Sequence, residues 1–448
     1  MRTNVAVHPD PIFTHEGAKA IRIDPVKQLR RSVMSCMLWE SEYYEDGVSI
    51  GTRIQAEIAE VLKLKNGAVT IASLAFEART RFKLRHVPLW LIIGLIRAQT
   101  PEAKVAVYGA ICTVIQRPDE IAELLAMYWK DKRQPLTRAM KLGLARVFCK
   151  FDEYSLSKYA NRDAGISIRD VMFLVHPKPK DEAQSALWKK LADKELTAPG
   201  TWEARLSAGE NKKTVFESLI AEKQLGALAL LRNLRGMIEA GVPLDTIRAA
   251  LETMKTERVL PFRFISAARY APTLEPELEE AMTRCVADMP KLSGRTVLVV
   301  DNSGSMYMAK ISEKSELNRA DAACALAMLL REICANVQVV VFSTAPVAVP
   351  PRRGFALRDI MQSATEHGST NTQIALQHAA LIGYDRCIVI TDEQSHQTIG
   401  PPLPGTKGYF INVASNKNGI GYGAWTHVDG FSESIADYIL QAESENES

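Results

Sequence analysis

The chain has 448 residues, which is more than a single hydrophobic core usually serves and predicts two or three domains. Hydrophobic residues make up 47% and charged residues 24%, so the composition excludes a disordered or membrane-embedded chain. The net charge is +3, and residues 291–448 hold 12 Lys and Arg against 16 Asp and Glu. The first 290 residues therefore carry +7 and the rest −4. This mild basic bias is compatible with binding a polyanion but does not establish it.

The ends of the chain and its cysteines predict a reduced, cytoplasmic protein. The N-terminus lacks the apolar segment of a signal peptide. The apolar run Leu89–Ile96 is far shorter than the roughly 20 residues that span a bilayer, so no membrane contact is expected. No two of the seven cysteines are spaced C-x-x-C, which predicts free thiols and neither disulfides nor a zinc site. Residues 1–24 are predicted to form an N-terminal arm, and residues 443–448 an acidic tail.

From about residue 54 to residue 288 the sequence has the periodicity of helices. Apolar residues recur every three or four positions in six segments: 54–64, 87–98, 119–129, 136–148, 226–238 and 243–254. Proline stands at or near the expected first turns, at positions 88, 101, 118, 135, 243 and 261. About a dozen short helices without a heptad pattern predict antiparallel pairs stacked as a solenoid.

The pattern changes at Arg295, where short runs of Val and Ile begin to alternate with helical segments. Strands are predicted at 295–300, 337–342, 386–391 and 408–413, and helices at 318–335, 372–382 and 433–440. Such alternation predicts a mostly parallel sheet with helices on both faces. The expected architecture is therefore an all-α helical-repeat domain over 25–290, followed by a doubly wound α/β domain over 291–442.

Polar side chains follow three strand ends of this predicted sheet. Asp301, Ser303 and Ser305 form a D-x-S-x-S turn, Thr370 lies in the loop before a helix, and Asp392 follows the strand CIVIT. Binding sites in such sheets lie beyond the carboxyl ends of the strands. Two carboxylates and three hydroxyls are hard oxygen donors that suit Mg²⁺. All five positions of the metal-ion-dependent adhesion site of von Willebrand A domains are filled, and the pattern resembles that site closely.

Three other interpretations of this region are weaker. Ser and Asp can simply cap the helices that follow them. A two-metal hydrolase needs more carboxylates than the two in sight, because Glu393 is the nearest spare one. The glycines of residues 400–407 have the spacing of a phosphate-binding loop, but Thr406 precedes the lysine and prolines remove the required amides. We therefore expect no catalytic residues.

Several segments of the helical half resemble the TROVE module of the Ro ribonucleoprotein family, in the form found in bacterial or phage Ro-like proteins. They are residues 29–44, 226–237 and 260–270 and, most closely, LSKYANRDAGISIRDVMFLVHPKPK at 156–180. The resemblance implies a ring of HEAT-like helix pairs closed by the A-like domain, and a protein that is monomeric as that ring. It further implies binding of small noncoding, Y-like RNA and of single-stranded ends of misfolded RNA, in RNA quality control or turnover with an exoribonuclease.

The closest-matching segment also carries the predicted RNA-binding residues. Basic side chains are dense there, as expected for phosphate contacts, and one aromatic ring could stack on a base. The set is Lys158, Tyr159, Arg162, Arg169, His176, Lys178 and Lys180, with Lys158 and Arg162 expected on one helix face. The role of His176 is implied by the resemblance. Two further basic runs, at 79–86 and 130–141, are candidates to line the ring, above all Arg79, Arg85 and Lys132.

The sequence thus favours a non-enzymatic RNA-binding scaffold with a magnesium site. The alternative is a protein-recognition adaptor that uses the metal site, and a metal-dependent hydrolase is a third interpretation. The sequence does not identify the RNA, the nuclease, or the group that completes the shell of the ion.

Overall fold

The computed structural model describes most of the chain as two compact units. One unit comprises residues 25–34 and 51–222, and the other comprises 1–24, 35–50 and 223–448. The described residues are 12–13, 17–20, 24–35, 47–160, 165–197, 202–207, 209–256, 259, 261–285, 287, 289–308, 310–311, 317–393, 395, 397–414, 423–429 and 434–444. None of the helices among them is both long and apolar enough to cross a membrane.

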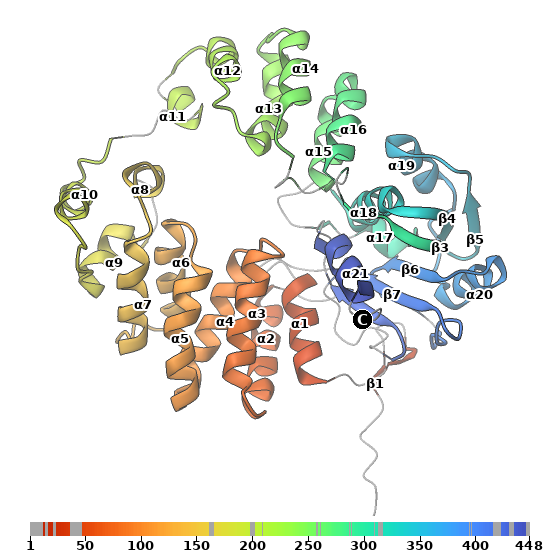
Figure 1. Cartoon of the computed structure of the whole chain (residues 1–448), viewed down its shortest axis with the longest axis horizontal. Helices are drawn as coiled ribbons and strands as arrows, with labels where there is room; N and C mark the ends of the chain where they lie inside the picture. The colour runs from red at the N-terminus through yellow and green to blue at the C-terminus, as the bar shows by residue number, and fades with distance from the viewer. Residues whose placement is uncertain are drawn as a thin grey trace, which may run out of the picture. The chain divides into compact units, whose positions relative to one another are not determined.

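The first unit is built from short helices, drawn from red to yellow-green in Figure 1. Helices α3, α5, α7 and α9 pack against one another in sequence, while α4 packs against α3, α5 and α6. This stacking of successive helices confirms the predicted helical-repeat architecture. The helices are α1 (Pro25–Ser35), α2 (Gly47–Leu62), α3 (Gly67–Thr80), α4 (His86–Ala98), α5 (Pro101–Val114), α6 (Asp119–Tyr128), α7 (Arg138–Phe148), α8 (Glu153–Ala160), α9 (Ile168–Val175), α10 (Glu182–Asp193), α11 (Trp202–Ser207) and α12 (Lys212–Ala221).

Local sequence signals set several of these helix starts. The Thr100 hydroxyl accepts a hydrogen bond from the backbone N–H of Ala103, and Pro101 occupies the first turn, where its missing N–H costs nothing. The Thr137 hydroxyl caps α7 in the same way. Ser167 and Asp170 form a reciprocal capping box at the start of α9.

The second unit combines four helices with a mixed six-stranded sheet. The helices are α13 (Ala227–Glu239), α14 (Leu244–Thr253), α15 (Pro261–Tyr270) and α16 (Glu275–Arg284), with the 3₁₀ turn η1 (Pro272–Leu274) between the last two. The sheet region contains β3 (Leu292–Asp301), α17 (Gly304–Met308), α18 (Arg319–Ile333), β4 (Cys334–Phe342), β5 (Pro346–Val349), α19 (Gly354–Ser363), α20 (Thr372–Ile382), β6 (Arg386–Thr391), β7 (Lys407–Asn412), β8 (Thr426–Asp429) and α21 (Ser434–Ser444). A two-stranded antiparallel ribbon, β1 (Ile12–Phe13) and β2 (Lys19–Ala20), belongs to the same unit.

The strands of the sheet lie in the order β5-β4-β3-β6-β7-β8, and all neighbours are parallel except β4 and β5. Val297 and Val299 of β3 share one face with α20, whereas α18 packs against β3, β4 and β6 (Figure 1). The chain leaves β3 toward β4 on one side and later returns to β6 on the other. The carboxyl ends of β3 and β6 therefore flank the topological switch point, which is where ligands bind in sheets of this kind.

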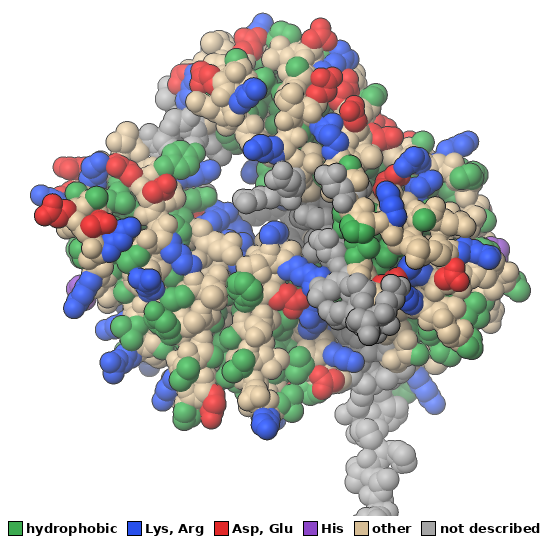
Figure 2. Space-filling view, viewed as in Figure 1, with side chains coloured by type: hydrophobic (Ala, Val, Ile, Leu, Met, Phe, Trp, Pro, Cys, Tyr) green, Lys and Arg blue, Asp and Glu red, His purple; other side chains and the backbone are tan. Residues whose placement is uncertain are grey.

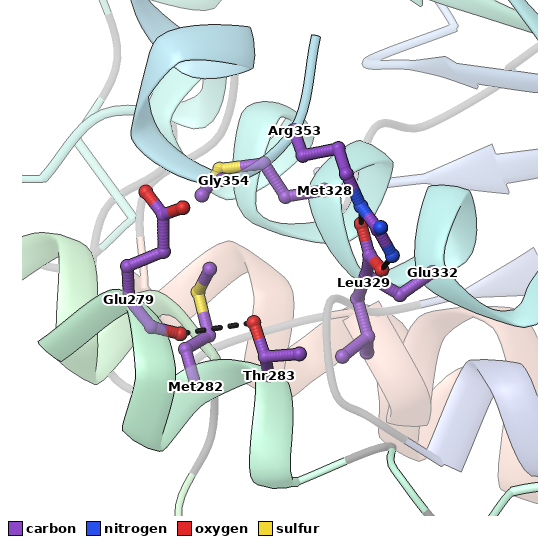
Figure 3. A pocket seen from close by; sticks show the side chains of 8 residues that line it. All are labelled: Glu279, Met282, Thr283, Met328, Leu329, Glu332, Arg353 and Gly354. Atoms are coloured by element: carbon purple, nitrogen blue, oxygen red, sulfur yellow. Dashed lines mark hydrogen bonds and ion pairs between the residues drawn. The ribbon is translucent and has the colours of Figure 1, made fainter. Parts of the chain in front are cut away.

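The junction between α16 and the sheet region is built on a long-range helix cap. The Glu279 carboxylate accepts a hydrogen bond of 2.8 Å from the backbone N–H of Phe355, at the start of α19. Gly354 has φ +52°, and a Cβ there would lie 2.0 Å from Glu279 Cδ, so this contact requires glycine. A cavity of about 300 Å³ lies beside it, with Met282 and Met328 on its wall (Figure 3). Helices α13, α14, α15 and α16, which precede residue 290, thus belong to the same compact unit as the sheet. The change from a helical to a strand pattern in the sequence coincides with the start of β3 and not with the boundary between the two units.

Candidate metal site and basic helix surface

The D-x-S-x-S turn lies directly beyond the carboxyl end of β3, as predicted. Asp301 ends the strand and is 1% exposed, and its Oδ1 accepts a hydrogen bond of 2.9 Å from the backbone N–H of Ser303. The Ser303 and Ser305 hydroxyls lie 3.3 Å apart. The turn therefore gathers one carboxylate and two hydroxyls at one point, with Ser305 half-buried and the other two side chains buried.

Backbone hydrogen bonds bring the Thr370 loop to this turn. The N–H of Gly304 donates to the carbonyl of Gly368 at 3.0 Å, and the N–H of Asn371 donates to the carbonyl of Ser343 after β4 at 2.9 Å. Thr370 is 6% exposed. The N-cap residue of α20 is Asn371, so capping of this helix does not account for Thr370.

Asp392 completes the cluster from the end of β6. It is fully buried, and the neighbouring Thr391 hydroxyl donates a hydrogen bond of 2.6 Å to Asp301 Oδ2, which ties the ends of β3 and β6 together. Burial, and then the negative charge of Asp392, raise the pKa of Asp301 to about 7. The negative charges of the two buried carboxylates thus repel each other, and a cation bound near them would relieve this repulsion.

The donor set of this cluster fits a hard divalent ion. No group of three His, Cys, Asp or Glu side chains that could hold a metal occurs among the described residues, so an ion here would depend on hydroxyl as well as carboxylate oxygen. Capping explains part of the cluster, because the Ser303 N–H bond closes a local turn before α17. It does not explain two buried carboxylates whose charges act on each other.

The sequence did not single out Arg319 as part of this site. Arg319 is the first residue of α18 and is 1% exposed, and its Nη1 lies 3.1 Å from Asp392 Oδ2. A second layer missed by the sequence surrounds Asn302, whose side chain donates 2.9 Å to the Thr365 hydroxyl and accepts from the Tyr307 hydroxyl. An arginine at a helix start gives no sequence signal for burial, since most arginines are exposed.

The predicted RNA-binding segment lies on α8, α9 and the loop before α10. Lys158 of α8 and Lys178 are exposed, as are His176 and Lys180. His176 ends α9 with φ 48°, a left-handed conformation. Lys180 has only a distant ion pair with Asp181, 3.9 Å, between two exposed side chains. The ammonium groups of Lys158, Lys178 and Lys180 are therefore open to solvent, where a phosphate could reach them.

Two of the remaining residues of this predicted set, Tyr159 and Arg169, contact other side chains or the backbone. The Arg117 guanidinium stacks over the ring of Tyr159 at 4.8 Å from its centroid, and Tyr159 is half-buried. Arg169 donates to the carbonyl of Ala192 at 2.6 Å and stacks over Phe173. Helix α8 ends at Ala160, and Arg162 lies outside the described residues, so the helix face it was expected to share with Lys158 stays a prediction.

In the first of the two further basic runs, carboxylates lie beside the arginines. Arg79 is buried and pairs with Glu120 at 2.7 Å, so it is not an exposed cation of the kind expected to line a ring. Arg85 pairs with Asp119 and Glu123.

Two residues of the second run, Arg133 and Lys141, line a shallow cavity of about 390 Å³. Its lining contains no carboxylate: Trp129, Arg133, Gln134, Pro135, Leu136, Lys141 and Leu174. Arg133 stacks over Trp129 at 4.8 Å, and Lys132 is exposed nearby. On the face that Figure 2 shows, the described Lys and Arg side chains are scattered among acidic and apolar ones.

Comparisons with known proteins agree with this architecture. The family model described as the TROVE domain matches residues 189–335, and that described as the Ro60 vWA domain matches residues 295–407. RNA-binding protein RO60 of Deinococcus radiodurans is 26% identical over 373 residues, 69% of each chain.

Two other matches are narrower in what they imply. Telomerase protein component 1 of Mus musculus is 35% identical over 89 residues, and this match covers 18% of the present chain and only 3% of that relative's length. The crystal structure of the Deinococcus radiodurans RO (RSR) protein superposes with a TM-score of 0.61, covering 95% of this chain and 100% of that one. At 19% identity the structural likeness concerns the fold alone.

Proposed function

The chain belongs to the Ro-like family of TROVE proteins, and from this premise we propose that it is an RNA-binding protein. The observation that carries the proposal is the likeness to RNA-binding protein RO60, which extends over 69% of both chains. The exposed cations of the segment Lys158–Lys180 support it physically. Phosphate contacts from such side chains position an RNA without reading its sequence.

The RNA that we propose is a small noncoding, Y-like RNA, together with single-stranded ends of misfolded or structured RNA. In this role the protein would act without catalysis, in RNA quality control or turnover with an exoribonuclease partner. A closed ring, monomeric as the family resemblance implies, would suit the capture of a single strand.

Filter binding at two salt concentrations tests the RNA-binding proposal. The full chain is titrated against a structured RNA, a single-stranded RNA and a matched duplex DNA. Phosphate contacts release counterions, so the affinity for RNA should fall steeply between 50 and 200 mM salt, roughly a thousandfold for six contacts. A folded chain that retains no RNA at low salt would contradict the proposal and favour the protein-recognition adaptor.

We also propose that the cluster of Asp301, Ser303, Ser305, Thr370 and Asp392 binds a divalent ion, Mg²⁺ by the hardness of its oxygen donors. The buried pair of carboxylates supports this proposal. When bound, the ion would supply an open coordination position to an acidic group of a partner, which is the use that the adaptor alternative requires.

Calorimetry on Asp301→Ala tests the metal site. Magnesium binding should be lost, while RNA binding through the other unit should stay within about twofold of wild type, because the two sites share no residue. Equal magnesium affinity in wild type and variant would remove the ion from this cluster. Turnover of an RNA or phosphoester with Mg²⁺ or Mn²⁺ would instead support the hydrolase interpretation.

A further inference from the structure

Arg319 places a positive charge inside the cluster of oxygen donors that is proposed to hold the ion. Its guanidinium lies 3.1 Å from Asp392 Oδ2, and the two side chains are 1% and 0% exposed. Because the pair is shielded from water, its charges interact much more strongly than those of a surface ion pair. The contact is therefore a feature of the site itself.

The position of Arg319 on its helix is electrostatically unfavourable, which points to a specific role. Arg319 is the first residue of α18, where the helix dipole disfavours a cation. The backbone there is fixed by two reciprocal caps between Asn318 and Asp321, and Asp321 accepts hydrogen bonds of 2.9 Å from Arg269 at both oxygens. The backbone at this helix start is thus held in place.

The charges of the cluster do not balance if an ion and Arg319 are both present. Two ionised carboxylates carry −2 and Arg319 carries +1, so a divalent ion would bring the buried cluster to a net +1. Without the guanidinium the same ion would leave it neutral. An uncompensated charge in a buried site is costly, so the guanidinium and the ion oppose each other at Asp392.

We propose that Arg319 is a built-in countercation that competes with the divalent ion for Asp392 and keeps the affinity of the site for that ion low. Binding of the ion then requires Arg319 to turn away from Asp392. The Arg319 side chain thereby becomes the part of the site that differs between the ion-bound and ion-free forms. This inference rests on the proposed metal site and adds the residue that sets its affinity.

Calorimetric titration of the full, EDTA-stripped chain with MgCl₂, and in parallel with MnCl₂, tests the proposal on Arg319→Met. Methionine keeps much of the side-chain volume and removes the charge. We expect the affinity for both ions to rise about tenfold or more, because the positive charge beside Asp392 that would repel the ion is lost. Arg319→Lys, which keeps a cation, should stay close to wild type.

Melting temperatures supply a second readout. Without an ion, Arg319→Met should melt below wild type, because the buried Asp392 carboxylate loses its countercharge. Mg²⁺ should then raise the melting temperature of the variant by more than that of wild type. A variant that folds only with Mg²⁺ would give the same support. Arg358→Met is the matched control, since Arg358 is largely buried in the same unit and pairs with Glu275 instead; its ion affinity should equal wild type.

The outcomes separate this inference from the metal site on which it rests. If wild type binds Mg²⁺ and Arg319→Met binds it no more tightly, the countercation role is wrong and the site stands. If neither binds, both proposals fail. Binding that persists in the double variant Arg319→Met, Asp301→Asn would place the ion elsewhere and overturn the inference. Should Arg319→Met not fold under any condition, the same comparison is made with Arg319→Gln.

Discussion

In the sheet region the charged side chains of the candidate site are buried, and Arg319 pairs with Asp392, whereas the lysines of α8 and of the loop before α10 are exposed to solvent. Asp301, Arg319 and Asp392 are each at most 1% exposed, while Lys158, Lys178 and Lys180 are exposed. A buried charge depends on its partner, so a single substitution has a large effect. Exposed cations act together on a polyanion, and each contributes a small, salt-dependent share. The two regions therefore call for different experiments.

The largest effect is expected at the end of the sheet opposite the candidate metal site. The guanidinium of Arg386, which is buried, makes two hydrogen bonds to the Glu443 carboxylate of α21, which also accepts from Lys407 Nζ at 3.0 Å. Glu443→Ala leaves Arg386 buried without a countercharge and should lower the free energy of unfolding by about 3–5 kcal/mol in urea titrations. The control is Asp359→Ala, a 62% exposed partner of Arg358, which should cost less than about 1 kcal/mol. Equal losses in the two variants would contradict the contrast between buried and exposed pairs.

A smaller effect, dependent on pH, is expected at Asp301 when no ion is bound. Its pKa is raised to about 7 in the folded chain, first by burial and then by Asp392, so folding favours the protonated form. The free energy of unfolding should therefore fall as pH rises from about 4, the unfolded value, to about 7. Asp301→Asn cannot ionise, so in EDTA its stability should decline less between pH 5 and 8. Identical pH profiles for the two chains would show that Asp301 ionises normally.

The sequence predicted those elements whose signals are local. Helix α20 has the bounds expected from its periodicity, Thr372–Ile382, and Pro101 and Pro261 begin α5 and α15. The D-x-S-x-S turn and Asp392 lie at the predicted strand ends because parallel strands carry their carboxyl ends to one edge, and Thr370 lies in the predicted loop before α20. The predicted helix at 318–335 is shorter in the structure, since β4 already begins at Cys334.

Helix α19 and the position of Arg319, which the sequence missed, depend on contacts made far along the chain, whereas strand β5 was missed because it is short. Helix α19 starts at a left-handed glycine and is capped by Glu279, which precedes it by 76 residues. Strand β5 has only four residues and pairs antiparallel with β4 at the sheet edge. Arg319 reaches Asp392 across 73 residues. The contacts of α19 and of Arg319 join residues 76 and 73 positions apart, so periodicity and capping rules cannot find them. Strand β5, with four residues, is too short to show a strand period.

A modest effect is expected from the shape of the RNA. If the chain forms the closed ring implied by the family, an RNA with a single-stranded 3′ tail should bind more tightly than the same duplex with blunt ends. The expected difference is about 1 kcal/mol or more, the order of one stacked base. Competition binding of the two RNAs measures it directly. Equal affinities would argue for an open solenoid or for a site on an outer surface only.

The central claim, that exposed cations between Lys158 and Lys180 bind RNA, is tested most directly by the salt dependence of a triple variant. Lys158, Lys178 and Lys180 are changed to Ala together, and the control changes Lys63, Lys190 and Lys213, which are also exposed but pair with Glu60, Glu153 and Glu217. Both variants lose three positive charges. The account predicts that the slope of log affinity against log salt falls by roughly two to three units in the first variant and little in the control. A well-folded first variant with the wild-type slope and affinity would contradict it.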